Sequence, residues 1–252
     1  MRGEPMLSRL TMKLKSKKEL TYNQASLFQG ALMEIISPEY AEQMHSGGLN
    51  PYSQYLKREK DDWYWTIQTV TQEAKEEIID RLNTNEFTSL FLKHNEMKIE
   101  IEEKNLTTVP MRDLLQDFYF QDKPRIIEIT FLTPTSFKQR GMYLIYPDLR
   151  CLYQSLMRKY GMARQEEMDS EETLEQLVNK STVIQYNLKS CYFYLEGVKI
   201  PAFSGKIKIK IAGPQTMVNF AHLLCEFGEY AGVGVKTAIG MGAMEIRKVA
   251  RT

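Results

Sequence analysis

Three groups of residues in this 252-residue chain could carry chemistry: its histidines, a glycine-rich segment and a row of lysines. Histidine can accept or donate a proton near neutral pH, which suits it to acid–base catalysis. His94 lies in a polar stretch typical of a surface turn, and His222 lies among apolar residues, which indicates a structural role. His45 is expected in a loop after the first helix, where an isolated histidine is usually a solvated side chain.

The glycine-rich segment spans residues 232–242 and matches neither of two common phosphate-binding motifs. A P-loop requires glycine directly before Lys-Thr, where this chain has Val235, and a dinucleotide fingerprint requires glycine where it has Thr237. We expect a surface loop, either merely flexible or able to bring backbone N–H groups close to a phosphate chain. The residues that would bind there are Gly232, Gly234, Lys236, Thr237, Gly240 and Gly242.

The lysine row consists of Lys206, Lys208 and Lys210, which alternate with three isoleucines. In a strand this alternation places the three ammonium groups on one face of the sheet and the isoleucines in the core. An ordinary amphipathic strand shows the same pattern. A compact basic row is nevertheless suited to the phosphates of a nucleic acid.

Composition places the chain among globular proteins, with 33 Lys+Arg against 32 Asp+Glu and 43% hydrophobic residues. It has no apolar run of about 18 residues and no signal region, which predicts a cytoplasmic protein without membrane contact. Cys151, Cys191 and Cys225 are widely spaced, favouring free core thiols over disulfides or a zinc site. Residues 1–20 are basic and residues 166–175 are acidic, so a polyanion would bind one face only.

Hydrophobic periodicity predicts the same order of elements twice: strand, helix, strand, strand, helix, strand, with one strand of the first copy unclear. The expected elements of the first copy are a strand over 7–15, a helix over 23–36 ended by Ser37-Pro38, a strand over 63–69, a helix near 78–82 and a strand over 97–102. Those of the second copy lie at 127–131, 149–160, 183–195, 203–211, 218–227 and 243–249. This order is typical of ferredoxin-like domains. We therefore predict an α+β fold of two tandem ferredoxin-like domains, residues 1–122 and 123–252.

Several strings resemble, in order, those of the CRISPR-associated endoribonucleases of the RAMP superfamily that process precursor CRISPR RNA. The glycine-rich segment 232–242 is the most specific of them. The others are Tyr22-Asn23, Phe28-Gln29-Gly30, His45, Phe131-Leu132-Thr133-Pro134-Thr135, Phe137-Lys138, Tyr146-Pro147-Asp148 and Ser155-Leu156. The fold of that family is a tandem ferredoxin-like pair, which agrees with the periodicity.

The resemblance implies metal-independent cleavage of CRISPR repeat RNA, without a cofactor, by attack of a ribose 2′-OH on the neighbouring phosphate. His45 falls where the family places its catalytic histidine. Some relatives have a tyrosine where this chain has Met33, and a lysine where it has Leu49-Asn50-Pro51. Nearby residues that could substitute, among which the sequence does not choose, are Tyr40, Tyr52, Ser53 and Lys57.

These departures leave two other functions open. The chain could be a non-catalytic RNA-binding subunit of a CRISPR effector complex, with proteins of that complex as partners, or a ferredoxin-like protein that binds a small anion. The sequence also leaves open whether two chains pair as a homodimer.

Overall fold

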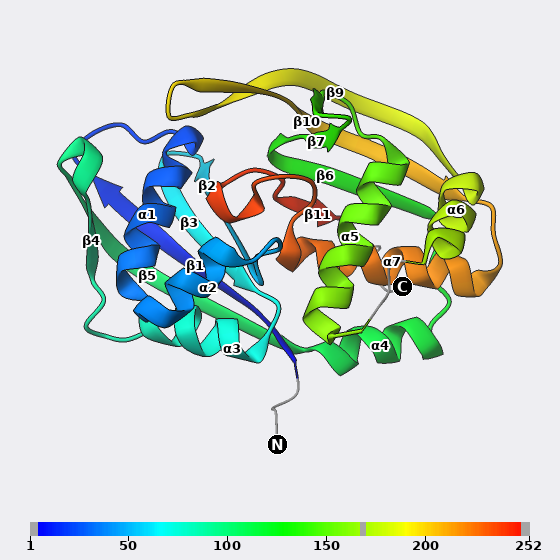
Figure 1. The fold of residues 1–252 in the computed structure, drawn as a ribbon, viewed down its shortest axis with the longest axis horizontal. Coiled ribbons are helices and arrows are strands. Elements are labelled where there is room, and N and C mark those ends of the chain that lie inside the picture. The colour runs from blue at the N-terminus through cyan, green and yellow to red at the C-terminus, as the bar shows by residue number, and fades with distance from the viewer. Residues whose placement is uncertain (1–4, 167–169, 248–252) are drawn as a thin grey trace.

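A computed structural model describes residues 5–166 and 170–247, with His45 described by its backbone alone (Figure 1). The first half consists of β1 (Met6–Ser16), η1 (Tyr22–Gln24), α1 (Ala25–Ile35), α2 (Pro38–Ser46), β2 (Tyr52–Glu59), β3 (Asp62–Thr69), α3 (Gln72–Ala74), the π-helix η2 (Lys75–Asp80), β4 (Ser89–Leu92), η3 (Lys93–Asn95) and β5 (Met97–Pro110). Helix α4 (Met111–Phe120) then leads to the second half.

The second half consists of β6 (Ile126–Thr135), β7 (Phe137–Gln139), β8 (Met142–Leu144), α5 (Leu149–Arg164), α6 (Glu171–Lys180), β9 (Ser181–Leu195), β10 (Val198–Ile211), α7 (Gln215–Ala231), η4 (Thr237–Ile239) and β11 (Met244–Ile246). Its sheet has the order β11-β6-β10-β9, and the first sheet has the order β2-β3-β1-β5-β4. Apart from the extra edge strand β4, both sheets place the first strand between the third and the last. The prediction of a tandem ferredoxin-like fold is confirmed.

Alternating side chains explain why the predicted strands form where they do. In β1, Leu10 and Met12 are fully buried against the helices of the first half, while Lys15 on the other face is exposed. In β10, Ile207 and Ile209 are fully buried in the core beneath α5 and α7. Each half therefore has its own hydrophobic core between a sheet and its helices.

The expectation that Ser37-Pro38 leads into a loop was wrong, because the same residues begin a second helix. Pro38 occupies the first turn of α2, where its missing N–H costs no hydrogen bond. The Ser37 hydroxyl oxygen accepts a hydrogen bond from the Tyr40 amide at 3.4 Å and caps the helix. His45 consequently lies in the last turn of α2, not in a loop. The periodicity also missed β2, β4, α4 and α6.

The C-terminal end of α7 packs against the open face of the first sheet and joins the two halves. Its terminal carbonyl groups would otherwise lack partners. Arg9 Nη2 donates to the Glu229 carbonyl oxygen at 3.0 Å, and Gln68 Nε2 donates to the same oxygen. Ser53 Oγ donates to the carbonyl oxygen of Tyr230 at 2.7 Å. The negative end of the α7 dipole thus meets a cation and two polar groups of the other half.

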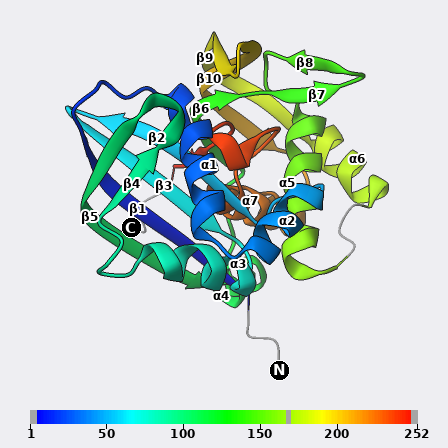
Figure 2. The same cartoon turned by 60° about the vertical axis from the view of Figure 1, so that its left-hand side comes forward.

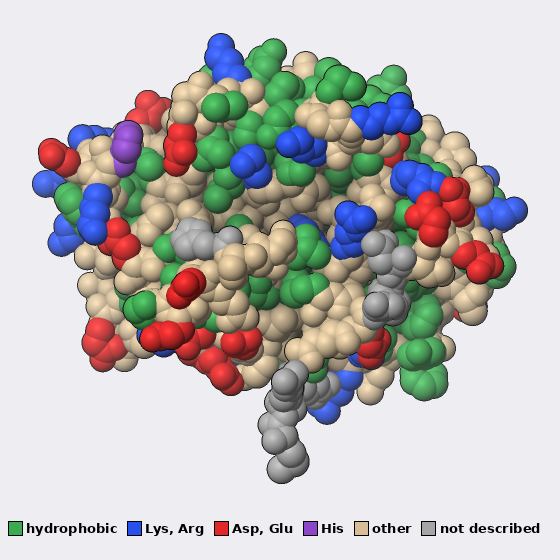
Figure 3. Space-filling model, viewed as in Figure 1, with side chains coloured by type: hydrophobic (Ala, Val, Ile, Leu, Met, Phe, Trp, Pro, Cys, Tyr) green, Lys and Arg blue, Asp and Glu red, His purple; other side chains and the backbone are tan. Residues whose placement is uncertain are grey.

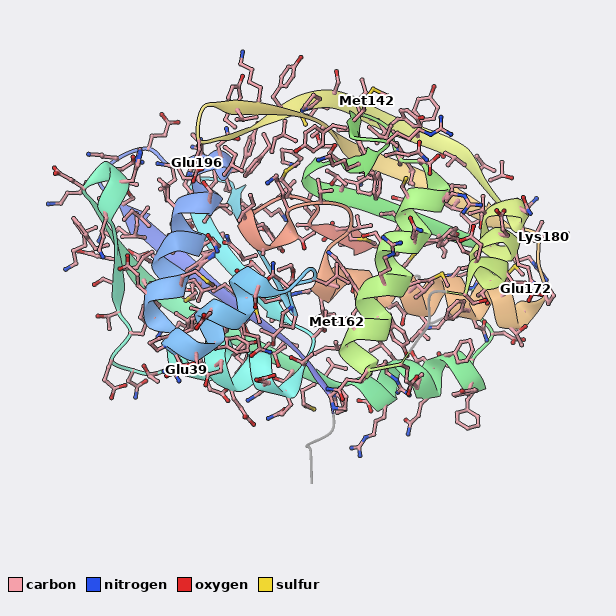
Figure 4. The ribbon with its side chains drawn as sticks, in the orientation of Figure 1. Glu39, Met142, Met162, Glu172, Lys180 and Glu196 are labelled. Carbon is pink, nitrogen blue, oxygen red and sulfur yellow. The ribbon has the colours of Figure 1, made fainter. Side chains whose placement is uncertain are left out.

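A second link is the hairpin of β9 and β10, which crosses the top of the molecule and ends above α1 (Figure 1). Its tip is hydrogen-bonded to the first half, since Tyr22 Oη donates to the Tyr192 carbonyl oxygen at 3.2 Å. The Tyr194 amide donates to Asn23 Oδ1 at 2.9 Å. Figure 4 labels Glu196 at the turn of this hairpin. The predicted domain boundary between residues 122 and 123 stays a prediction. Helix α4, which precedes this boundary, packs on α7 of the second half through Phe118.

Gln54 is a buried junction of β2 with three other segments, which makes it a test of the fold. Its Nε2 donates to the carbonyl oxygens of Ala25 and Ala238 at 2.7 and 3.1 Å, and its Oε1 accepts from Trp65 Nε1 at 2.7 Å. We expect Gln54→Leu to lower the free energy of unfolding by about 2–4 kcal/mol, because buried partners are left unsatisfied. Urea unfolding of wild type and variant measures the difference.

Gln185→Leu is the matched control, since Gln185 is exposed on β9. We expect it to change the free energy of unfolding by no more than about 0.5 kcal/mol. Equal losses for the two variants would show that the hydrogen bonds of Gln54 do not stabilise the fold.

Candidate functional site

The glycine-rich segment 232–242 lies between the two halves, with α1 on one side and α5 on the other (Figure 2). The expectation of an exposed surface loop was wrong. Thr237 and Ala238 are buried, and Lys236 is the one side chain of the segment that is exposed. Lys236 adopts a left-handed conformation with φ of 60° at the start of η4. Lys236 is therefore the most exposed side chain that the segment offers to a ligand from solvent.

Two glycines of the segment are required by packing as well as by backbone conformation. Gly234 has φ of +78°, and a Cβ there would lie 2.3 Å from the Ser136 carbonyl oxygen. Gly240 has φ of +112°, and a Cβ there would lie 2.3 Å from the Cβ of Ala25. A side chain at either position would clash and also favour another backbone conformation. These glycines let the segment pass between the halves.

Backbone amides of the segment already donate hydrogen bonds within the protein. The Gly234 amide donates to Ser155 Oγ at 2.9 Å, and the Val235 amide donates to the Ser136 carbonyl oxygen at 3.0 Å. Gly232 and Gly242 also donate, to the carbonyl oxygens of Gly228 and Pro134. These amides are not available to cradle phosphate in this conformation. Contact with a polyanion would depend more on Lys236 than on the glycines.

Tyr40 and Tyr52 are brought together in the core of the first half. Burial raises the pKa of Tyr52 to about 12, although a hydrogen bond with Gln29 acts against this rise. Burial also raises the pKa of Tyr40, with the carboxylates of Glu73 and Glu77 and the phenol of Tyr52 adding to the effect. Tyr40 Oη is buried without a partner in the described part of the chain. Both phenols stay protonated at neutral pH and can donate hydrogen bonds.

Lys57 does not join this pair, because it points to the opposite face of β2. Its Nζ lies 2.8 Å from Glu59 Oε1, and its side chain is 36% exposed. Burial acts to lower the pKa of Lys57, but the hydrogen bond and charge of Glu59 outweigh it, so the pKa is raised. Lys57 is therefore a cation at neutral pH, on the face of the first sheet that Ser53 shares.

The three histidines have different settings. His45 lies in the last turn of α2, and its side chain lies outside the described residues. His94 is exposed in η3, with Nδ1 2.9 Å from Asn95 Oδ1. His222 is buried in α7, where its Nε2 lies 2.8 Å from the Pro124 carbonyl oxygen, and burial lowers its pKa. The predictions of a surface turn and a structural histidine are confirmed.

The lysine row lies on the face of the second sheet that points away from α5 and α7. Lys206 and Lys210 are exposed, while Lys208 Nζ lies 3.6 Å from Glu128 Oε2. Arg247 on the same face lies 3.8 Å from that carboxylate. Lys248, in the expected last strand 243–249, lies outside the described residues. The row is thus on a different half of the molecule from Tyr40 and Tyr52.

Charged side chains are unevenly distributed on the face shown in Figure 3. Acidic side chains gather along its lower left edge, near α2 and α3, and several Lys and Arg side chains lie scattered among hydrophobic ones in its upper part.

No group of three or more potential metal ligands occurs among the described residues. Nor does any helix described there combine the length and the apolar character that a membrane crossing requires.

Comparison with known proteins gives the family. Residues 129–244 match the family model of the CRISPR-associated endoribonuclease Cas6. The Cas6 endoribonuclease of Streptococcus thermophilus is 33% identical over 223 residues, covering 88% of this chain and 90% of the relative. The chain belongs to the Cas6 family. The Cas6 endoribonuclease of Mycobacterium tuberculosis is 30% identical over 249 residues, covering 97% of this chain and 79% of that relative.

The fold agrees with membership of the Cas6 family. A solved Cas6 product complex superposes with a TM-score of 0.80 at 19% identity, covering 96% of this chain and all of that chain. The resemblance inferred from the glycine-rich segment and the strings around it is confirmed. Membership of the Cas6 family identifies this chain as an endoribonuclease. The roles of its individual side chains stay predictions.

Sequence reasoning missed one residue that supports the Cas6 glycine-rich segment from within. Lys159 lies on α5 among buried apolar residues, three positions after Leu156 and one before Tyr160. A lysine within the apolar stripe of a helix was the signal that could have revealed it, because lysine is almost never fully buried without a partner. Its Nζ donates to the segment itself.

Gly234→Ala tests whether packing demands glycine in the segment. We expect it to lower the free energy of unfolding by about 2–4 kcal/mol, since a left-handed conformation costs about 1–2 kcal/mol and the clash with Ser136 adds to it. Gly141→Ala is the control, because Gly141 has φ of +82° but open space around its Cβ position. Urea unfolding should show a smaller loss for Gly141→Ala. Equal losses would mean that the clash is relieved without cost.

Proposed function

We propose that this Cas6 family member cleaves CRISPR repeat RNA within precursor transcripts and so produces mature guide RNAs. The observation that carries the proposal is the identity of 33% with a curated endoribonuclease along 88% of the chain. The lysine row and the exposed Lys236 support RNA binding, because cations on a surface neutralise phosphates and release counterions.

The reaction that we propose is a metal-independent transesterification. The ribose 2′-oxygen attacks the neighbouring phosphorus and loses its proton to a base, while the bond from phosphorus to the 5′ oxygen breaks. An acid gives a proton to that 5′ oxygen. The products are a 2′,3′-cyclic phosphate and a 5′-OH, so atoms and charge balance without another reactant.

We assign the proton transfer to His45, because an unperturbed imidazole has a pKa of about 6.5 and serves as acid or base near neutrality. Tyr40 and Tyr52 are candidates for hydrogen-bond donors rather than bases, since both phenols have raised pKa values. Lys57 remains a candidate for contact with the phosphate backbone, since it stays charged on the opposite face of β2.

One observation favours a second function, that of a non-catalytic RNA-binding subunit of a CRISPR effector complex. Met33, partly buried in the first core, stands where some relatives have a tyrosine. Incubating the protein with repeat RNA in EDTA separates the two functions. A cyclic phosphate end, identified by mass spectrometry, supports the enzyme, and tight binding of uncut RNA supports the subunit.

We expect His45→Ala to reduce the single-turnover cleavage rate by on the order of 10² or more, the usual contribution of a positioned proton-transfer group. RNA affinity should change little, because one side chain contributes little to backbone binding. Cleavage rates and filter-binding curves of wild type and variant measure both quantities. His94→Ala is the control, since His94 is exposed and bonded to its neighbour Asn95. Near-normal cleavage by His45→Ala would remove His45 from the mechanism.

Replacing Lys206, Lys208 and Lys210 together with glutamine should weaken RNA binding and its salt dependence. Each lost phosphate contact on a single strand lowers the slope of log K against log salt by about 0.7, so the triple variant should lose about 2. Stability should be kept, because the isoleucine face of β10 is unchanged.

The charge-matched control replaces three other exposed lysines, Lys60, Lys93 and Lys98, with glutamine. These lie on the first half, away from β10. If both triple variants show the same slope as wild type, the lysine row does not contact RNA.

A further inference from the structure

Lys159 of α5 is a buried cation that holds the glycine-rich segment from its inner side. Its side chain is almost completely buried, with 4% of the residue exposed. Nζ donates to the carbonyl oxygens of Ala231 and Gly232 at 2.9 and 3.1 Å, and to Thr237 Oγ1 at 2.8 Å. An ammonium group has three N–H donors, so all of them are used. Every acceptor belongs to the end of α7 or to the segment that follows it.

Helix α5 positions this ammonium together with a second support. Ser155 lies one turn earlier on the same face of α5, and its Oγ accepts from the Gly234 amide at 2.9 Å. Figure 4 labels Met162, three residues after Lys159, at the end of α5 that faces the first half. Two side chains of one helix thus fix both the carbonyl groups and an amide of the segment.

The charge of Lys159 has no counter-ion in the described part of the protein. All three of its acceptors are uncharged, and burial is the cause that lowers the pKa of Lys159 to about 7. The titratable side chains nearest in sequence on the surrounding elements are Arg158 and Tyr160 on α5, Glu229 and Tyr230 on α7 and Lys236 in the segment. Glu229 is the one acid among them, and burial is the only cause that acts on the pKa of Lys159. We therefore expect both charged and neutral Lys159 in the free protein near neutral pH.

We propose that Lys159 is a positioning residue for RNA and that binding of the phosphodiester backbone at the segment is coupled to uptake of a proton by Lys159. This inference rests on the proposed function. A neutral amine has two N–H donors and a lone pair, so one of the three oxygens would face the lone pair instead of a donor. The charged form holds the segment in the shape that presents Lys236. The phosphate in turn supplies the negative charge that the site lacks.

The coupling fixes the sign of two pH dependences. RNA favours the charged form and therefore raises the pKa of Lys159. The affinity for RNA consequently falls as the pH rises above the pKa that Lys159 has in the free protein. For one proton, the fall is at most about tenfold per pH unit. Stability of the free protein has the opposite trend. Unfolded lysine has a pKa of about 10.4, so above pH 7 the unfolded chain binds more protons, and the contribution of Lys159 to stability rises with pH. A purely structural role would give only the second trend.

The experiment is isothermal titration calorimetry of the protein with the repeat RNA of its own CRISPR array at pH 7.5, in phosphate and in Tris. The two buffers differ in ionisation enthalpy, so the difference in heat gives the number of protons taken up. Every protein in this experiment carries His45→Ala, so that protons bound by that imidazole do not contribute to the measured heat. The protein with this substitution alone is the parent. We expect uptake approaching one proton, and affinity that falls from pH 6.5 to 8.5.

Three further variants in that background make the result specific. Lys159→Arg keeps a charge at every pH, so it should bind RNA without proton uptake and with little pH dependence. Lys159→Met should bind about tenfold more weakly at pH 6.5, also without uptake. Lys98→Met, at an exposed lysine of β5, should behave as its parent.

RNA binding without proton uptake by the parent protein would overturn the inference and leave the proposed function intact. That measurement needs no substitution of Lys159, so it decides the matter even if those variants fail to fold. Uptake that persists in Lys159→Arg would also overturn the inference, because the proton would then bind elsewhere. Failure of the protein with native His45 to bind repeat RNA would overturn the proposed function and the inference with it.

Discussion

The structure depends on satisfying an irregular stretch of backbone that runs through the interior between the two halves. Buried amides and carbonyl groups need partners, and a segment whose one regular element is the three-residue helix η4 cannot supply all of them itself. Gln54 from β2, Ser155 and Lys159 from α5, and the backbone at Ser136 provide them. The two ferredoxin-like units are thus held around one shared segment, which explains why glycine is needed where the segment passes closest to its neighbours.

Much of the fold could be predicted because most strands have one buried and one exposed face. Strand β2 was missed because it lacks that contrast: residues 52–56 are all buried, since the end of α7 covers its second face. Ser53 and Gln54 are polar but buried there, because they form hydrogen bonds with residues far away in the sequence. Tertiary partners of this kind leave no periodic signal in the strand itself.

The candidate site could be predicted by residue type but not by role. Gly234 and Gly240 were named as binding residues, and the structure shows positive φ and close packing there. The packing was missed because composition alone does not distinguish an exposed loop from a packed one. Tyr40 and Tyr52 were selected by their proximity to His45 in sequence, and burial then decided which protonation state they hold. Lys57, somewhat farther away in sequence, was separated from them by the alternation of β2.

The hairpin of β9 and β10, anchored on Tyr22 and Asn23, has a mechanical consequence. Together with the end of α7 it fastens the halves at two separate places, so rotation about a single hinge would break contacts at one of them. Such a molecule gains little by closing around a ligand, but it also loses little conformational entropy when it binds. Discrimination between RNA molecules would then come from how well each fits a rigid surface.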